Sequence, residues 1–253
     1  MPRSTFYYQQ VKHDYREIKE TILLRYKRNR KRDGYHPMTL KLRQMGFHLN
    51  HKTVLKLMNA LGIHSILRKK RHGKRGKTSH IAPNVLNRDF TATALNQKWV
   101  TDVTEFRVGE EKLYFSPLMD LANREIIAYN FAKRPKFSLV KRMPEEGLGK
   151  LKPSECPIIH SDQGVLYGSA EWVKMLEGKA IQSMSRRGNC YDNAVIESFF
   201  AILKSECFYS RTYTSIAELQ AEIEEYLVYY NQERIKLDLK GLSPVQYRAQ
   251  YLS

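Results

Sequence analysis

The chain has 253 residues, 42% of them hydrophobic, so it can fill a core and is not a disordered protein. Lys and Arg number 43 against 26 Asp and Glu, which gives a formal charge of +17. This balance favours nucleic acid as a partner, although ribosomal proteins and proteins of membrane surfaces share it. The cysteines, Cys156, Cys190 and Cys207, are odd in number and never form a C-x-x-C pair, which argues against a disulfide framework or a zinc site.

The sequence also argues against a membrane or secreted protein. No apolar run approaches the roughly 20 residues of a membrane helix, and the start MPRSTFYYQQ lacks the apolar stretch of a signal peptide. We therefore expect a cytoplasmic protein with no membrane partner.

Residues 15–67 have the pattern of three short helices. Apolar residues recur every four positions over 18–26, a second helix restarts within GYHPMTLKLRQMGF, and Asn50 is placed to cap a third. Three helices in this length suit a helix-turn-helix domain, here 1–67, whose last helix would expose Lys52 and Lys56 to DNA. A small helical bundle with a solvated basic face is the alternative.

Residues 68–95 are expected to be a basic linker. The stretch RKKRHGKRGK carries seven basic residues and no apolar periodicity. It is expected to follow a phosphate backbone, with Arg68, Lys69, Lys70 and Arg71 as DNA contacts. A solvated tether is the alternative.

From residue 96 onwards, strand and helix patterns alternate, which predicts an α/β layer domain over 96–212 and a helical extension over 213–253. The expected strands are 98–107, 112–120, 125–131, 157–162 and 181–185. The expected helices are 137–151, 169–177, 192–207, 215–231 and 244–251.

Three carboxylates stand out by their positions. Asp102 lies in the first expected strand, Asp162 ends a short apolar strand, and Glu197 lies inside a helix. An acidic residue in a buried strand is costly unless it is paired or bound to a metal. Three carboxylates without a nucleophile suit phosphodiester transfer by two divalent ions held about 4 Å apart. Taken one at a time, each is better explained by a surface or capping role.

The segments around these residues resemble a known family. WVTD (99–102), IIHSDQG (158–164) and SMSRRGNCYDNAVIESFF (183–200) are similar to the three catalytic blocks of DDE transposases of the IS-three family. The chain looks like the product of the second of that family's two overlapping reading frames. The resemblance extends to MNALGIHSILRKKR (58–71) and to the tail YNQERIKLDLKGLSPVQY (230–247), and so covers nearly the whole chain.

The resemblance implies an RNase H-like core similar to retroviral integrase, with a mixed five-stranded sheet, flanking helices and a small all-α domain before it. It further implies cleavage and strand transfer of DNA at the ends of a bacterial insertion sequence. Two Mg²⁺ or Mn²⁺ ions would be held by Asp102, Asp162 and Glu197. The expected partners are the terminal repeats, target DNA, further copies of the chain and an upstream first-frame protein, in a nucleoid-associated location. Further DNA contacts are expected at Arg186, Arg187, Asn189 and Lys204.

Two departures from the family pattern leave alternatives open. Residues 163–196, 34 in all, separate Asp162 from Glu197, one fewer than the family carries. Pro144 and Gly147 fall in a segment that the family carries as a continuous helix, where proline costs about 3 kcal/mol. A decayed copy that only binds DNA is therefore one alternative, and a nuclease that stops after hydrolysis is another.

Overall fold

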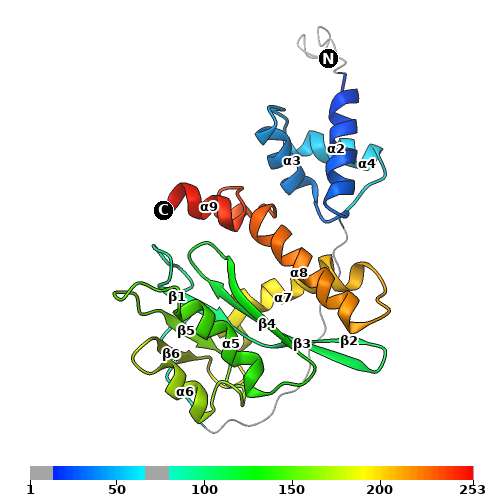
Figure 1. Cartoon of the computed structure of the whole chain (residues 1–253). Coiled ribbons are helices and arrows are strands. Elements are labelled where there is room, and N and C mark those ends of the chain that lie inside the picture. The colour runs from blue at the N-terminus through cyan, green and yellow to red at the C-terminus, as the bar shows by residue number, and fades with distance from the viewer. Residues whose placement is uncertain (1–13, 66–79, 253) are drawn as a thin grey trace. The chain divides into compact units, whose positions relative to one another are not determined.

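The computed structural model describes residues 14–65 and 80–252 (Figure 1). The chain divides into two compact units, residues 1–66 and 67–253. The boundaries expected at 67, 95 and 212 stay predictions.

The first unit is a small all-α domain, as expected. It contains α2 (Arg16–Arg28), α3 (Tyr35–Gln44) and α4 (His51–Ala60). The predicted cap of α4 is confirmed, because Asn50 Oδ1 accepts a hydrogen bond from the backbone N–H of Lys52 at 2.9 Å. Its core is formed by one set of buried side chains from all three helices: Ile22, Tyr26, Met38, Leu42, Val54, Leu57 and Met58.

The second unit is built on one mixed sheet. Its strands are β1 (Lys98–Thr101), β2 (Thr104–Val108), β3 (Glu111–Asp120), β4 (Ile126–Ala132), β5 (Ile158–Ser161) and β6 (Ile181–Met184). The helices are α5 (Phe137–Leu148), α6 (Ala170–Leu176), α7 (Ala194–Glu206), α8 (Ile216–Gln232) and α9 (Pro244–Tyr251). Short 3-10 turns occur at Cys190–Asn193, Phe208–Ser210 and Leu237–Leu239.

The pairing of the strands fixes their directions. β3 pairs antiparallel with β1, β2 and β4, whereas β1 pairs parallel with β5 and β5 parallel with β6. The single strand expected over 98–107 is interrupted after Thr101, so the sheet has six strands instead of five. The expected mixed sheet is otherwise confirmed.

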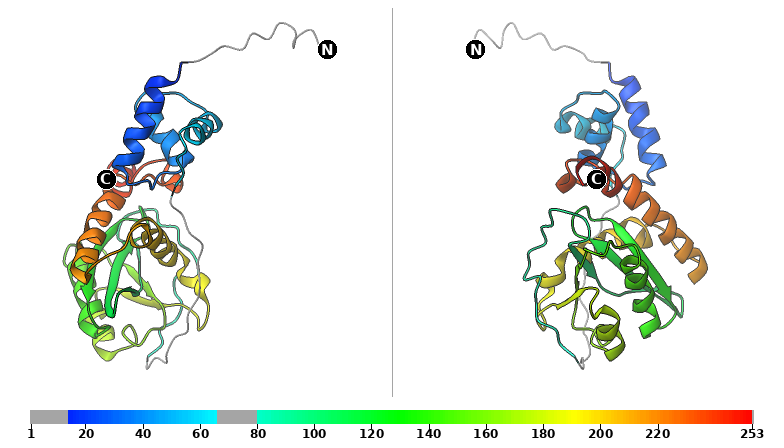
Figure 2. Two further views of the ribbon diagram at one scale, coloured as in Figure 1. Left: turned by 90° about the vertical axis from the view of Figure 1, so that its right-hand side faces the viewer. Right: turned by 60° about the vertical axis from the view of Figure 1, so that its left-hand side comes forward.

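Helices cover both faces of the sheet (Figures 1 and 2). Successive residues of a strand point to opposite faces. Val100 and Met119 accordingly join the core beneath α7 and α8, whereas Trp99 and Leu118 join the core beneath α5 and α6. The central strands thus carry apolar side chains on both faces, although a few polar side chains, such as Ser116 and His160, are buried among them.

Helix α5 runs unbroken from Phe137 to Leu148 with Pro144 inside it. The expectation that Pro144 and Gly147 could break this helix is wrong. Both residues are buried, and a Cβ on Gly147 would lie 3.2 Å from the Trp99 ring. The helix therefore approaches the sheet closely at a point where a side chain larger than that of glycine would press on Leu118 and Trp99, and packing offsets the weak local propensity.

Candidate active site

Asp102 and Asp162 follow directly after two neighbouring parallel strands. β1 and β5 are paired in the register Trp99 with Ile159 and Val100 with His160, an offset that carries on to the two aspartates. Side chains at matching positions of parallel strands point to the same face, and the strands lie about 4.8 Å apart. The two carboxylates are therefore set side by side at the carboxyl end of the sheet.

Backbone amides hold one oxygen of each carboxylate. The N–H of Val103 donates to Asp102 Oδ1 at 2.8 Å, and the N–H of Gly164 donates to Asp162 Oδ1 at 2.9 Å. Gly164 lies so close that a Cβ added to it would be 2.7 Å from that oxygen. The absence of a side chain at residue 164 is thus a condition for the observed orientation of Asp162.

The charges of both aspartates affect the pKa of a buried tyrosine, Tyr167. Tyr167 is buried, and its hydroxyl oxygen lies 3.3 Å from Thr101 Oγ1. Burial raises the pKa of Tyr167 well above its usual value, and the negative charges of Asp102 and Asp162 raise that pKa further. Tyr167 therefore stays protonated. Both carboxylates raise its pKa, which agrees with their placement side by side.

Glu197 is brought to the same end of the sheet by α7. The side-chain amide of Asn193, the residue before the helix, donates from Nδ2 to the backbone carbonyl of Thr101 at 3.3 Å. Glu197 follows one helical turn later, about 6 Å along the axis. Ile196 and Phe199 are buried against the sheet, whereas Glu197 is half-buried.

The donor chemistry of these residues fits a hard divalent cation, because carboxylate oxygens are the ligands that Mg²⁺ and Mn²⁺ prefer. The fit is not complete in the observed rotamers. Within the described ranges 14–65 and 80–252, no three His, Cys, Asp or Glu side chains converge on one point as metal ligands would. The register sets the two aspartates at matching positions after neighbouring strands, and the bond from Asn193 to Thr101 ties the start of the helix that carries Glu197 to the same strand.

The loop before α7 is held by a buried carboxylate, Asp192. Its oxygens accept five hydrogen bonds, from Nδ2 of Asn84, Nε of Arg88, and the backbone N–H, Nε and Nη2 of Arg186. These partners, the bonds to Arg186 first, hold the pKa of Asp192 far below its usual range. Asp192 thus ties residues 84–88 to the loop.

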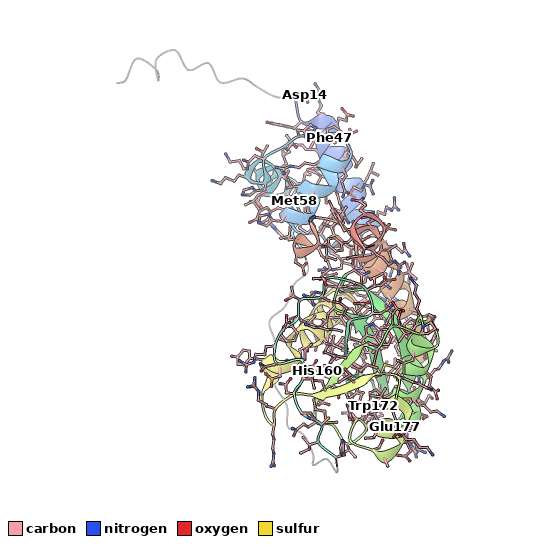
Figure 3. The ribbon with its side chains drawn as sticks, turned by 90° about the vertical axis from the view of Figure 1, so that its left-hand side faces the viewer. Asp14, Phe47, Met58, His160, Trp172 and Glu177 are labelled. Atoms are coloured by element: carbon pink, nitrogen blue, oxygen red, sulfur yellow. The ribbon has the colours of Figure 1, made fainter. Side chains whose placement is uncertain are left out.

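His160 belongs to the core and not to the carboxylates. It is fully buried on β5 (Figure 3), with Nδ1 at 2.8 Å from Ser183 Oγ and Nε2 at 3.1 Å from Ser185 Oγ. Leu86 N–H donates to Ser183 Oγ, and Ser185 Oγ donates to the carbonyl of Ser161. A neutral ring that accepts at Nδ1 and donates at Nε2 satisfies every partner. Burial lowers the pKa of His160 to about 4 and keeps the ring neutral.

The expected DNA contacts have different surroundings. Lys52 and Lys56 are exposed on α4, and Arg187 is exposed in the loop after β6. Arg186 is held by Asp192, as described above. Asn189 accepts a hydrogen bond from the N–H of Tyr191, and Nζ of Lys204 lies 5.2 Å from the centroid of the Phe106 ring. Arg68, Lys69, Lys70 and Arg71 lie outside the described residues.

Sequence reasoning missed the residues that support the site: Gly164, Tyr167, Asn84 and Arg88. Gly164 stood within the quoted block IIHSDQG, so its nearness to Asp162 could have been suspected. Asn84 and Arg88 lie about a hundred residues before Asp192, and no local pattern in the sequence links them.

Comparison with known proteins agrees with this architecture. An HTH-like domain matches residues 12–71, and two models of the integrase core domain match residues 92–190 and 197–252. The putative transposase InsK for insertion sequence element IS150 of Escherichia coli K12 is 47% identical over 99% of this chain and 90% of its own length. Transposase InsF for insertion sequence IS3A of the same organism is 32% identical over 92% of this chain and 82% of its own length.

The chain belongs to the IS-three family of insertion-sequence transposases. Among solved structures, this transposase resembles the simian T-cell lymphotropic virus intasome in complex with PP2A regulatory subunit B56 gamma, with a TM-score of 0.53. The match covers 85% of this chain and 70% of that one at 16% identity, and it confirms the predicted fold. None of the described helices has the length and apolar character that crossing a bilayer requires.

Proposed function

We propose that this transposase cuts and joins DNA at the ends of its insertion sequence, with Asp102, Asp162 and Glu197 as ligands of two Mg²⁺ or Mn²⁺ ions. The observation that carries the proposal is the register of β1 and β5, which sets Asp102 beside Asp162. The hydrogen bond from Asn193 to the Thr101 carbonyl supports Glu197 as the third ligand, because it ties α7 to the strand that ends at Asp102.

The reaction consists of two displacements at phosphorus. Water attacks a phosphodiester at the element's end, the bond to the 3′ oxygen breaks, and a 3′-hydroxyl and a 5′-phosphate result. That 3′-hydroxyl then attacks a target phosphodiester, forms a new P–O bond and releases the 3′-hydroxyl of the target strand. When bound, the two ions supply activation of the attacking oxygen and stabilisation of the leaving oxygen.

The chain's own residues orient the ligands. The amides of Val103 and Gly164 fix one oxygen of Asp102 and of Asp162, which leaves little freedom in the direction of the carboxylates. Tyr167 and Thr101 close the site from the side of the core with a buried pair of hydroxyl groups. Glu197 lies on a helix that is fixed only one turn away, so a change of rotamer is the movement that completes the ligand set.

DNA is the partner that the charge of the chain favours. The formal charge of +17 favours binding to a phosphate backbone, and α4 of the HTH-like unit exposes Lys52 and Lys56 for it. We propose that the terminal repeats and target DNA are the substrates and that several copies of the chain assemble on DNA. We further propose that the chain works with an upstream first-frame protein, in a cytoplasmic, nucleoid-associated location.

Manganese binding by calorimetry on the full chain tests the ligand set without knowledge of the DNA ends. We expect wild type to bind, and Asp162→Asn and Glu197→Gln to bind about tenfold more weakly. Glu145→Gln, which changes an exposed carboxylate of α5, is the matched control and should bind like wild type. Equal binding by wild type and both site variants would contradict the assignment.

A DNA-binding protein without catalysis is the second candidate, because the three carboxylates do not converge in the observed rotamers. If the chain only binds DNA, Mn²⁺ should fail to bind even to the wild type. The same calorimetric series therefore separates the two functions.

A further inference from the structure

Arg124, at the turn between β3 and β4, is a largely buried cation without a hydrogen-bond acceptor. Its side chain is 20% exposed, yet its guanidinium donates no hydrogen bond to any described residue, and Nη1 is wholly buried. The nearest carboxylate oxygen, Asp238 Oδ2, lies 3.8 Å from Nε, which is too far for a hydrogen bond. An arginine presents five N–H donors, so this is an unusual deficit.

A second cation in the same place, Lys236, has no ion pair within the described part of the chain. Its Nζ lies 5.7 Å from the centroid of the Tyr230 ring, and the hydroxyl of Tyr230 donates to the backbone carbonyl of Arg124 at 3.1 Å. Burial, with the charges of Arg234 and Arg124, lowers the pKa of Lys236 to about 8, against the opposing effect of Asp238. Tyr230 thus contacts both residues, Lys236 through its ring and Arg124 through the backbone carbonyl.

Neighbouring arginines show that this deficit is specific. Arg234 donates to both carboxylate oxygens of Glu206, with the closest contact at 2.7 Å, and Arg248 donates to both oxygens of Glu125. Arg124 and Lys236 lack such a close carboxylate: Arg124 has the distant Asp238, and Lys236 has no ion pair within the described ranges 14–65 and 80–252. Burial of a charge that has a distant counter-ion or none is costly, so an anion from outside the chain would stabilise both residues.

We propose that Arg124 and Lys236 form a phosphate-binding site that takes a backbone phosphate of DNA. A guanidinium fork and an ammonium point charge together suit the oxygens of a phosphate. The source of the phosphate rests on the proposed function, whereas the site itself does not. Asp238, exposed and 3.8 Å from Nε of Arg124, is the group that the phosphate displaces.

The phosphate site lies at the end of the sheet opposite the catalytic carboxylates. Leu121 N–H donates to the carbonyl of Lys98, so the turn that carries Arg124 follows the amino end of β1, whereas Asp102 follows its carboxyl end. Four strand residues span about 13 Å. A DNA that occupies both places therefore extends along the whole of this strand, and the phosphate site positions it at a distance from the reacting bond.

The test compares full-length wild type with Arg124→Met and Lys236→Met, and uses Lys240→Met as the matched control. Lys240 is an exposed cation of the same loop whose Nζ lies over the Tyr251 ring. Binding of a short random-sequence duplex is measured by fluorescence anisotropy across a salt series. We expect each site variant to bind about tenfold more weakly and to lower the slope of log affinity against log salt by about 1. The DNA affinity of Lys240→Met should fall only as far as the loss of one positive charge from the surface requires.

Thermal unfolding with inorganic phosphate, against chloride of equal ionic strength, supplies the second readout. Phosphate should raise the Tm of wild type and leave both site variants unchanged. Without phosphate, Lys236→Met should match or exceed the wild-type Tm, because it removes an unpaired cation from a crowded positive region. A lowered Tm with undiminished DNA and phosphate binding would overturn the proposal and make the cluster structural.

The two proposals fail separately. Asp162→Asn should keep the wild-type response to phosphate, so failure of Mn²⁺ binding leaves the phosphate site standing. If phosphate raises the Tm of wild type alone but DNA affinity is equal in all variants, the site takes a free phosphate compound and DNA as its source is wrong.

Discussion

Gly164→Ala should disturb the carboxylate site without removing a ligand. The added Cβ would lie 2.7 Å from Asp162 Oδ1, whereas ordinary contacts of this kind begin near 3.4 Å, so the carboxylate must move by about 0.7 Å. Functional groups in a site must be held within about 0.5 Å of their working geometry. Mn²⁺ affinity should therefore fall by about tenfold, the lower end of the range for outer residues of a metal site.

The free energy of unfolding of Gly164→Ala should stay close to that of wild type. Alanine restricts the unfolded chain and stabilises a compatible site by about 0.4 to 1 kcal/mol, which offsets the local strain at residue 164. Urea unfolding and calorimetry on the same samples separate the two effects. Gly34→Ala is the control, since its Cβ would meet only Ser65 at an ordinary 3.7 Å. Unchanged Mn²⁺ affinity in Gly164→Ala would refute the claim that this glycine orients Asp162.

Three further predictions concern stability. Asp192→Asn should lower the free energy of unfolding by about 3 kcal/mol at pH 7, far more than the exposed Asp89→Asn. Because folding lowers the pKa of Asp192, this difference should begin to shrink in urea titrations as the pH falls below the ordinary 3.8, and it should be lost only as the pH falls through the much lower pKa of the folded state. Arg234→Met should lower the free energy of unfolding by about 3 to 5 kcal/mol, because it leaves the charge of Glu206 buried and without its arginine. Glu206→Gln in the same chain should restore part of this free energy. Gly147→Ala should lower the thermal midpoint, because overpacking of about 1 to 3 kcal/mol outweighs a helix gain of about 1; a raised midpoint would show that the sheet yields.

The sequence was sufficient where the signal is local. The periodicity of the helices, the cap at Asn50 and the aspartate that ends a short apolar strand at 162 all follow from neighbouring residues, and the structure has them where they were expected. The juxtaposition of Asp102 with Asp162 could not be derived from either segment alone. It depends on which strands pair and in which register, and only the family resemblance supplied that information beforehand.

Long-range compensation is the part that the sequence did not reveal. Pro144 and Gly147 are unfavourable for a helix when judged by propensity, but in the fold both lie in the contact between α5 and the sheet. Arg186 in a basic loop indicated a DNA contact, yet its guanidinium is held by Asp192. In each case a partner distant in sequence changes the meaning of a local pattern.

The interruption of the first strand at Asp102 has its cause in β3. Leu121 N–H donates to the Lys98 carbonyl, so Lys98 and Leu121 form a hydrogen-bonded pair of the antiparallel ladder. Such pairs recur every second residue. The register of β1 with β3 therefore makes Asp102 and Pro117 the position of another such pair. Proline has no N–H and cannot make its half of that pair. The ladder therefore opens at Asp102 and resumes in the same register at Thr104. Asp102 keeps its alignment with Asp162, and the backbone N–H of Val103 donates to the Asp102 carboxylate. A proline on one strand thus shapes the site on the next.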